Sequence, residues 1–153
     1  MRKILLILIF PLVNNVQAQQ SADSQLNIIL LIGDGMGLSQ ISAGMYVNNN
    51  KTVLEDFPDI GLSKTHAINS LVTDSAASGT AMACGEKTYN GVLGINSKNK
   101  KLQSVLEICE DHGYNTGLIA TSSIVHATPA SFYANVDSRK SLKKLPFSLV
   151  KAM

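Results

Sequence analysis

The chain has almost no excess of charge of either sign. Its 153 residues include 13 basic and 11 acidic ones, and charged residues make up only 16% of the sequence. If residues 1–18 leave as a signal peptide, two basic residues leave with them, and the 11 that remain equal the 11 acidic ones. Nucleic acids and membrane surfaces are bound by clustered basic residues, so this balance indicates neither of them as a partner.

The apolar run at residues 4–13 is too short to span a bilayer comfortably. It follows a basic pair and leads to small residues at positions 16–18, which is the pattern of a secretory signal. We expect residues 1–18 to be a signal peptide, with an uncleaved membrane anchor as the alternative. Residues 19–153 would then be exported, to the periplasm or out of the cell, as part of a single domain.

Cysteine is scarce, since the sequence has only Cys84 and Cys109. Export favours disulfide formation, so the two could pair. Cys109, however, lies on the apolar face of a helix predicted over residues 102–112, and Cys84 closes a predicted helix of small residues. We therefore expect two buried free thiols that behave as small apolar side chains.

The chain also lacks the usual nucleotide-binding loops. A continuous apolar run at residues 27–32 predicts a buried parallel strand, and residues 38–47 are predicted to form a helix. Between them, residues 33–37 read Gly-Asp-Gly-Met-Gly, which does not match Gly-x-Gly-x-x-Gly and is followed by no P-loop lysine. The glycines alone fit either a phosphate-cradling loop or a metal site. Asp34 favours the metal site, because a carboxylate beside a phosphate needs a cation between them.

A serine precedes a run of small residues at positions 72–81, which read Val-Thr-Asp-Ser-Ala-Ala-Ser-Gly-Thr-Ala. Because alanine favours helix, residues 76–83 are predicted to be helical, with Ser75 at the N-cap or in the first turn. A helix N-terminus presents unpaired N–H groups and partial positive charge, which suit phosphate. Ser75 could then attack phosphorus while backbone amides hold the phosphate oxygens. The alternative is an ordinary N-capped core helix.

Two more strands are predicted, at residues 60–65 and 115–120. A glycine-rich surface loop or hairpin is expected at residues 85–94. The strand at 115–120 leads into a polar loop, residues 121–128, and Pro129 could begin a short helix after it.

The strand ends carry the candidate site residues. Asp34 and Ser75 follow two of the predicted strands, and His126 and Thr128 follow another. The carboxyl ends of parallel strands lie on one side of a sheet, so these four side chains could converge there.

On these residues, the chain resembles the alkaline phosphatase family. The resemblance rests on four segments in order, residues 33–37, 72–81, 126–130 and 137–139. It implies an α/β fold of three layers, in which a mostly parallel central sheet is flanked by helices. It also implies hydrolysis of phosphate monoesters with two zinc ions and one magnesium ion as cofactors.

The resemblance assigns a role to each candidate residue. Asp34 would bridge a zinc ion and the magnesium ion, and Ser75 would be the nucleophile that forms a phosphoserine and contacts the same zinc. Thr128 would bind magnesium through its hydroxyl, and Arg139 would hold two phosphate oxygens. These roles suit the residues, because a metal lowers the pKa of a bound hydroxyl and arginine offers phosphate a planar fork of donors.

His126 departs from part of the family. Its position is held by Asp in some members and by His in others. Imidazole suits zinc better than magnesium, so His126 is a candidate ligand that would change the preference of the third metal site. The alternative is that its ring only hydrogen-bonds a metal-bound water.

The remaining zinc ligands of the family lie in a much longer C-terminal part. This sequence has only three histidines, and His112 falls on a predicted apolar helix face. We therefore expect an N-terminal fragment of a larger enzyme, with an incomplete sheet and no activity by itself; a homodimer is left open. The alternatives are a phosphodiesterase or sulfatase of the same superfamily, and a non-catalytic module that binds phosphate or a metal.

Overall fold

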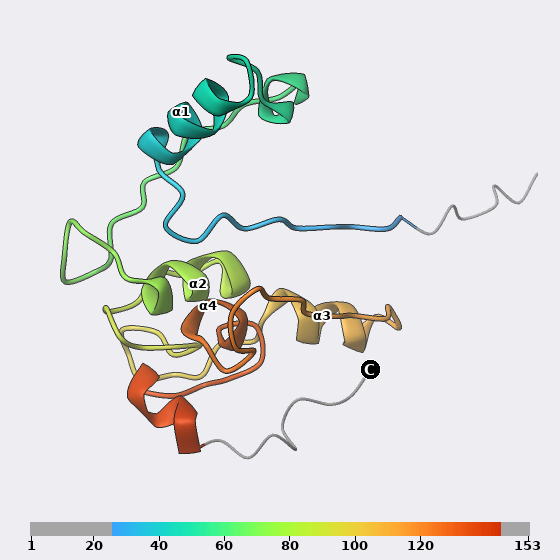
Figure 1. Cartoon of the computed structure of the whole chain (residues 1–153). Coiled ribbons are helices and arrows are strands. Elements are labelled where there is room, and N and C mark those ends of the chain that lie inside the picture. The colour runs from blue at the N-terminus through green and yellow to red at the C-terminus, as the bar shows by residue number, and fades with distance from the viewer. Residues whose placement is uncertain (1–25, 145–153) are drawn as a thin grey trace, which may run out of the picture. The chain divides into compact units, whose positions relative to one another are not determined.

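The computed structural model describes residues 26–144, with side chains up to residue 141. The signal peptide expected at residues 1–18 lies outside the described residues. The chain divides into two compact units, Met1–Ile32 and Gly33–Met153. In the first unit, the described residues 26–32 are extended and form no helix (Figure 1).

The described part of the second unit contains four α-helices and two 3-10 helices. In chain order they are α1 (Leu38–Val47), η1 (Val53–Asp56), α2 (Ser75–Cys84), α3 (Val105–Asp111), α4 (Ala127–Ala130) and η2 (Arg139–Lys144) (Figure 1). None of the helices in the described range is long and apolar enough to cross a membrane.

Helix α2 begins and ends at residues with strong capping preferences. Asp74 is its N-cap, and the Asp74 side chain accepts a hydrogen bond from Ala77 N at 2.9 Å. Gly85 follows the helix with φ 70°, a conformation that glycine adopts without steric cost, and its N–H donates to Ala81 O. Ser75 is therefore the first residue of the helix, in the first turn as one of the two predicted placements had it.

The other predicted helices form with small differences. Helix α1 has the predicted bounds, residues 38–47. Helix α3 is shorter than the predicted 102–112, because Ser104 and Glu107 form a capping box in which each side chain accepts from the backbone N–H of the other. It ends before Gly113, which has φ 80°.

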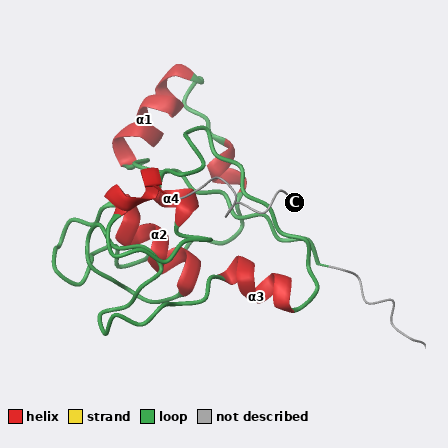
Figure 2. Cartoon of the chain, turned by 90° about the horizontal axis from the view of Figure 1, so that it is seen from below, coloured by secondary structure: helices red, strands yellow, loops and turns green. Residues whose placement is uncertain are grey.

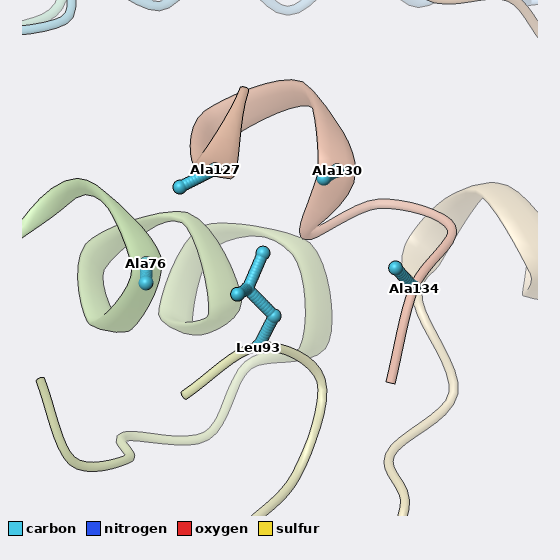
Figure 3. Close-up of a cluster of buried hydrophobic side chains, with 5 residues drawn as sticks. All are labelled: Ala76, Leu93, Ala127, Ala130 and Ala134. Atoms are coloured by element: carbon cyan, nitrogen blue, oxygen red, sulfur yellow. The ribbon is translucent and has the colours of Figure 1, made fainter. Parts of the chain in front are cut away.

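Helices α2 and α4 pack against each other through small side chains. The buried apolar cluster consists of one leucine and four alanines, Ala76, Leu93, Ala127, Ala130 and Ala134. Figure 3 shows the Leu93 side chain reaching between α2 and α4. At Gly79 of α2, an added Cβ would lie 2.5 Å from Ser131 Oγ and 3.4 Å from the Cα of Thr128, so the two backbones come close only because this residue is glycine.

Residues 85–94 form a loop, but its end is buried rather than on the surface. Leu93 and Val136 exchange two backbone hydrogen bonds of 2.9 Å in an isolated antiparallel bridge. Thr80 of α2 is fully buried, and its Oγ1 donates to Val92 O and accepts from Gly94 N. The loop is thus attached both to α2 and to the segment that precedes η2.

The three strands predicted at residues 27–32, 60–65 and 115–120 were wrong as elements of this structure. The backbone there has no regular secondary structure, and no strand forms in the part of the chain that the structure describes (Figure 2). A strand needs ladder hydrogen bonds from a neighbour, and apolar, β-branched composition does not supply them.

The large apolar side chains of these segments are exposed. Ile29 exposes 83% of its surface, and Leu62 and Ile119 are fully exposed. The buried cluster, by contrast, is mostly alanine. An apolar content of 45% therefore does not produce a large core within the described residues.

Three other residues differ from expectation. His112, predicted on a buried face, is exposed at the end of α3, where its Nδ1 hydrogen-bonds a backbone carbonyl at 2.7 Å. Cys84 and Cys109 are free thiols, and both are half-buried rather than buried. Burial is the main cause that raises the pKa of Cys84 to about 11, and the negative charges of Glu107 and Glu86 nearby add to it. This thiol therefore stays protonated near neutral pH.

The contact at Gly79 can be tested by comparison with a glycine in open space. Gly79→Ala places a methyl group against Ser131 Oγ, whereas Gly44→Ala in α1 meets no atom within 4 Å. Gly79→Ala should give a free energy of unfolding about 1–3 kcal/mol lower than Gly44→Ala. Adding Ser131→Ala should recover much of that loss, because it removes the clashing oxygen. Urea unfolding of the full-length protein measures these differences, and equal stability of the two alanine variants would contradict the packing.

Candidate active site

Asp34 lies at the centre of a tight glycine turn. Met36 N donates to Gly33 O at 3.2 Å, which closes the turn around Asp34 and Gly35. Gly35 has φ 70°, the left-handed region in which glycine is favoured. The Met36 side chain lies against Gly33, where an added Cβ would come within 2.7 Å of it. The turn thus requires glycines on both sides of Asp34, whose side chain is exposed.

The Asp34 carboxylate accepts hydrogen bonds from two hydroxyl groups that are distant in sequence. Ser75 Oγ donates to its Oδ1 at 3.2 Å, and Thr128 Oγ1 donates to its Oδ2 at 2.6 Å. Ser75 begins α2 and Thr128 lies in α4, so the packing of these helices helps to bring both hydroxyls to one carboxylate. The three residues converge as expected, but on helix starts and a turn rather than on strand ends.

His126 is not part of this cluster. It is the N-cap residue of α4 and its side chain is exposed. Its backbone joins the helix, since His126 N donates to Ser123 O at 2.8 Å and His126 O accepts from Ala130 N at 2.9 Å. Helix α4 therefore begins at Ala127, before the predicted start at Pro129. Metal binding by His126 stays a prediction.

Arg139 is held by Asp74, the residue before Ser75. Arg139 Nη1 donates to Asp74 Oδ2 at 3.2 Å, and the two side chains form a partly exposed ion pair. Gly91 N donates to the same oxygen at 3.0 Å, while the other oxygen caps α2. The pair therefore keeps the guanidinium of Arg139 beside the start of α2.

The ionised form of Asp74 is favoured in the folded chain. Burial by itself raises the pKa of this carboxyl group, but hydrogen bonds from Ala77 N, Gly91 N and Arg139 outweigh it and hold the pKa below its ordinary value. Arginine also keeps its charge well above neutral pH. The ion pair is thus fully charged at neutral and alkaline pH.

Sequence reasoning assigned no role to Asp74 or to Gly91. Asp74 carried a usable signal, because an acidic residue directly before an alanine-rich helix is a typical N-cap. Gly91 carried none, since its contact with Asp74 joins residues 17 positions apart.

The donor atoms around Asp34 fit a hard cation. One carboxylate and two hydroxyls are oxygen donors of the kind that magnesium takes. Zinc sites use His, Cys, Asp or Glu side chains, and residues 26–144 contain no group of three such side chains that could hold a metal ion. Asp34 and Thr128 thus carry oxygen donors that fit magnesium, with the Ser75 hydroxyl beside them, and the expected zinc sites lack a complete ligand group within the described range.

Comparisons with known proteins show which family the chain belongs to. Residues 25–149 match the sequence profile of the alkaline phosphatase family. The chain belongs to this family. Alkaline phosphatase 4 of Bacillus subtilis is 44% identical over 128 residues, which cover 78% of this chain and 28% of that protein. Alkaline phosphatase of Escherichia coli is 41% identical over 124 residues, which cover 74% of this chain and 26% of that protein.

Solved alkaline phosphatases share its fold. The alkaline phosphatase of the Antarctic bacterium TAB5 superposes with a TM-score of 0.73 at 46% identity, covering 77% of this chain and 34% of that one. Two variants of it, in which a histidine is replaced by Glu or Asp, have magnesium bound in a site designated M3. The predicted alkaline-phosphatase-like α/β fold class is thereby confirmed, although this chain spans only about a third or less of the length of its relatives.

Asp74→Asn tests the charge of the capping carboxylate while keeping an oxygen for the cap. The folded-state pKa of Asp74 is lowered from 3.8, so its ionised form stabilises the folded chain above that pH, and the contribution disappears as the pH falls through the lowered value. Asp74→Asn should therefore lower the free energy of unfolding at neutral pH and have little effect in strong acid. Urea unfolding of the full-length protein at a series of pH values measures this, and a difference independent of pH would contradict it.

Proposed function

We propose that this chain is part of a metal-dependent phosphate monoester hydrolase that acts through a covalent phosphoserine at Ser75. The observation that carries the proposal is the Asp34 carboxylate, which receives hydroxyl hydrogen bonds from both Ser75 and Thr128. A nucleophile and two oxygen ligands for a cation are thus gathered at one point. Membership of the alkaline phosphatase family supports the same reaction class.

The oxygen cluster would hold the metal side of the site. Asp34 and Thr128 would bind magnesium, and Asp34 and Ser75 would contact a zinc ion, with the other zinc ligands supplied from outside residues 26–144. His126 is a further candidate ligand. The metals would supply charge stabilisation for the attacking and leaving oxygens and would lower the pKa of the serine hydroxyl.

Ser75 would carry the phosphoryl group between two displacements. In the first, a bond forms between Ser75 Oγ and phosphorus, the bond from phosphorus to the substrate oxygen breaks, and the hydroxyl proton of Ser75 ends on the released alcohol. In the second, water attacks phosphorus, inorganic phosphate leaves, and Ser75 regains its proton. The first turn of α2 suits this step, because backbone N–H groups and the helix dipole there favour an anion.

Arg139 would bind the phosphate. Its guanidinium is fixed beside α2 by Asp74, and a guanidinium can place two N–H donors on two phosphate oxygens. Its Nη1 is already engaged by Asp74, so the remaining N–H groups of the fork are those available to phosphate.

We also propose that the active protein is longer than this chain and is exported. The matched part of this chain covers about a third or less of the length of its relatives, the described residues lack zinc ligand groups, and apolar segments are exposed. The export proposal rests on the signal-like pattern of residues 1–18. Phosphate monoesters are the proposed substrates.

The nucleophile is tested by Ser75→Ala in the full-length enzyme. The metals and Arg139 would remain but the attacking oxygen would not, so turnover should fall on the order of 10³-fold or more and the phosphoenzyme should disappear. Ser78→Ala is the matched control, because Ser78 lies in the same helix and its hydroxyl only bonds back to Asp74 O. Phosphate release and mass spectrometry of the acid-quenched enzyme are the measurements. Wild-type turnover in Ser75→Ala would end the assignment.

The need for further chain is tested on residues 19–153 alone. Metal binding and folding should depend on missing ligands and missing cover for the apolar segments. We expect no turnover of an aryl phosphate at alkaline pH with zinc and magnesium, weak zinc binding, and aggregation or partial folding. Steady turnover that a chelator abolishes and that Ser75→Ala removes would show instead that this chain assembles a complete site.

A further inference from the structure

The loop at residues 88–93 contacts both the serine side and the arginine side of the candidate site. Its Thr88 O accepts from Ile68 N at 3.0 Å, and Leu93 is bridged to Val136. Between these anchors lie Asn90 and Gly91. Neither has a role in the reaction described above.

The Asn90 side chain binds the backbone on both sides of Thr73. Its Oδ1 accepts from Asp74 N at 2.9 Å, and its Nδ2 donates to Val72 O at 2.9 Å. The two bonds fix the orientation of the amide, because Asp74 N needs an acceptor and Val72 O needs a donor. They hold the last backbone units before Ser75 in one conformation.

Asn90 is itself held in place. Its backbone N–H donates to Asn69 Oδ1 at 3.0 Å, and its side chain is half-buried. The next residue, Gly91, donates its N–H to Asp74 Oδ2 and accepts from Arg139 N at 2.7 Å. The side chain of Asn90 therefore binds the backbone that leads to Ser75, whereas the main chain of Gly91 binds the Asp74 carboxylate and the Arg139 backbone.

We infer that Asn90 is a positioning residue for Ser75. The inference rests on the proposed function, and in it Asn90 contacts neither the substrate nor a metal. It acts by fixing the backbone from which the serine hydroxyl is presented, so that Ser75 Oγ stays aligned for attack. The guanidinium of Arg139 is held by the Asp74 carboxylate and its main chain by Gly91 O, and Asn90→Ala keeps both of these groups. Loss of the Asn90 amide should therefore impair the attack of Ser75 more than the binding of phosphate.

The first test is Asn90→Ala in the full-length, metal-loaded enzyme. The single-turnover rate of Ser75 phosphorylation should fall about 10–100-fold, the usual effect of losing a group that orients a reacting residue. The inhibition constant of inorganic phosphate should change by less than about threefold, since phosphate is bound by other groups. An unchanged phosphorylation rate, or a loss of phosphate binding as large as the loss of rate, would overturn the inference.

Asn96→Ala is the matched control. Asn96 is a buried asparagine whose side chain, like that of Asn90, makes two bonds to backbone, accepting at Oδ1 from Lys98 N and Lys100 N within its own turn. It should lose stability as Asn90→Ala does but keep its phosphorylation rate. An equal loss of rate in both variants would show a general structural effect and overturn the inference.

A double-mutant cycle with Ser75→Ala separates positioning from stability. Residual turnover of Ser75→Ala does not use the serine oxygen, so Asn90→Ala should reduce it little further. An equal fold-change in turnover in both backgrounds would overturn the inference.

If Asn90→Ala does not fold, Asn90→Asp is used in the same cycle. It keeps the shape and the acceptor for Asp74 N but not the donor to Val72 O. If wild type forms no phosphoserine, the proposed function itself fails; if only the cycle fails, the function stands and the positioning role does not.

Discussion

The hydrogen bonding of the Asp74 carboxylate is the constraint on which the candidate site depends. One oxygen caps α2, and the other accepts from Gly91 N and Arg139 Nη1. A helix start, a loop and a distant arginine are thereby joined at the residue that precedes Ser75. Because several donors compensate the charge of Asp74, the pKa of this carboxyl group is lowered in spite of burial. Asp74 therefore stays ionised, and keeps these contacts, at neutral and alkaline pH.

The candidate site also depends on close packing of small side chains between α2 and α4. The contact between α2 and α4 consists mainly of alanines and of Gly79, so the two helix starts come near enough for Ser75 and Thr128 to reach Asp34. A larger residue in this contact would push α2 and α4 apart and so move Ser75 and Thr128 away from Asp34. Size at these positions therefore matters to the site as much as the identity of its polar residues.

The extended apolar segments contrast with this small core. Side chains such as Ile29, Leu62 and Ile119 are exposed, and no strand ladder forms among the described residues. Exposed apolar side chains are unfavourable in water, and a sheet built with additional strands and helices would cover them. This agrees with relatives that share the fold and of which this chain covers about a third or less.

The sequence by itself determined the features that depend on neighbouring residues. Alanine content, a capping acid and Gly85 place α2, and the glycines around Asp34 define its turn, because such preferences act over a few residues. Family motifs added the identity of Ser75, Thr128 and Arg139 as candidates.

Only the tertiary structure decided which of these residues meet. Asp34 lies 41 residues from Ser75 and 94 from Thr128 in sequence, and Arg139 lies 65 from Asp74. Contacts over such separations depend on how helices and loops pack, and strands depend on partners, so neither could be derived from local pattern.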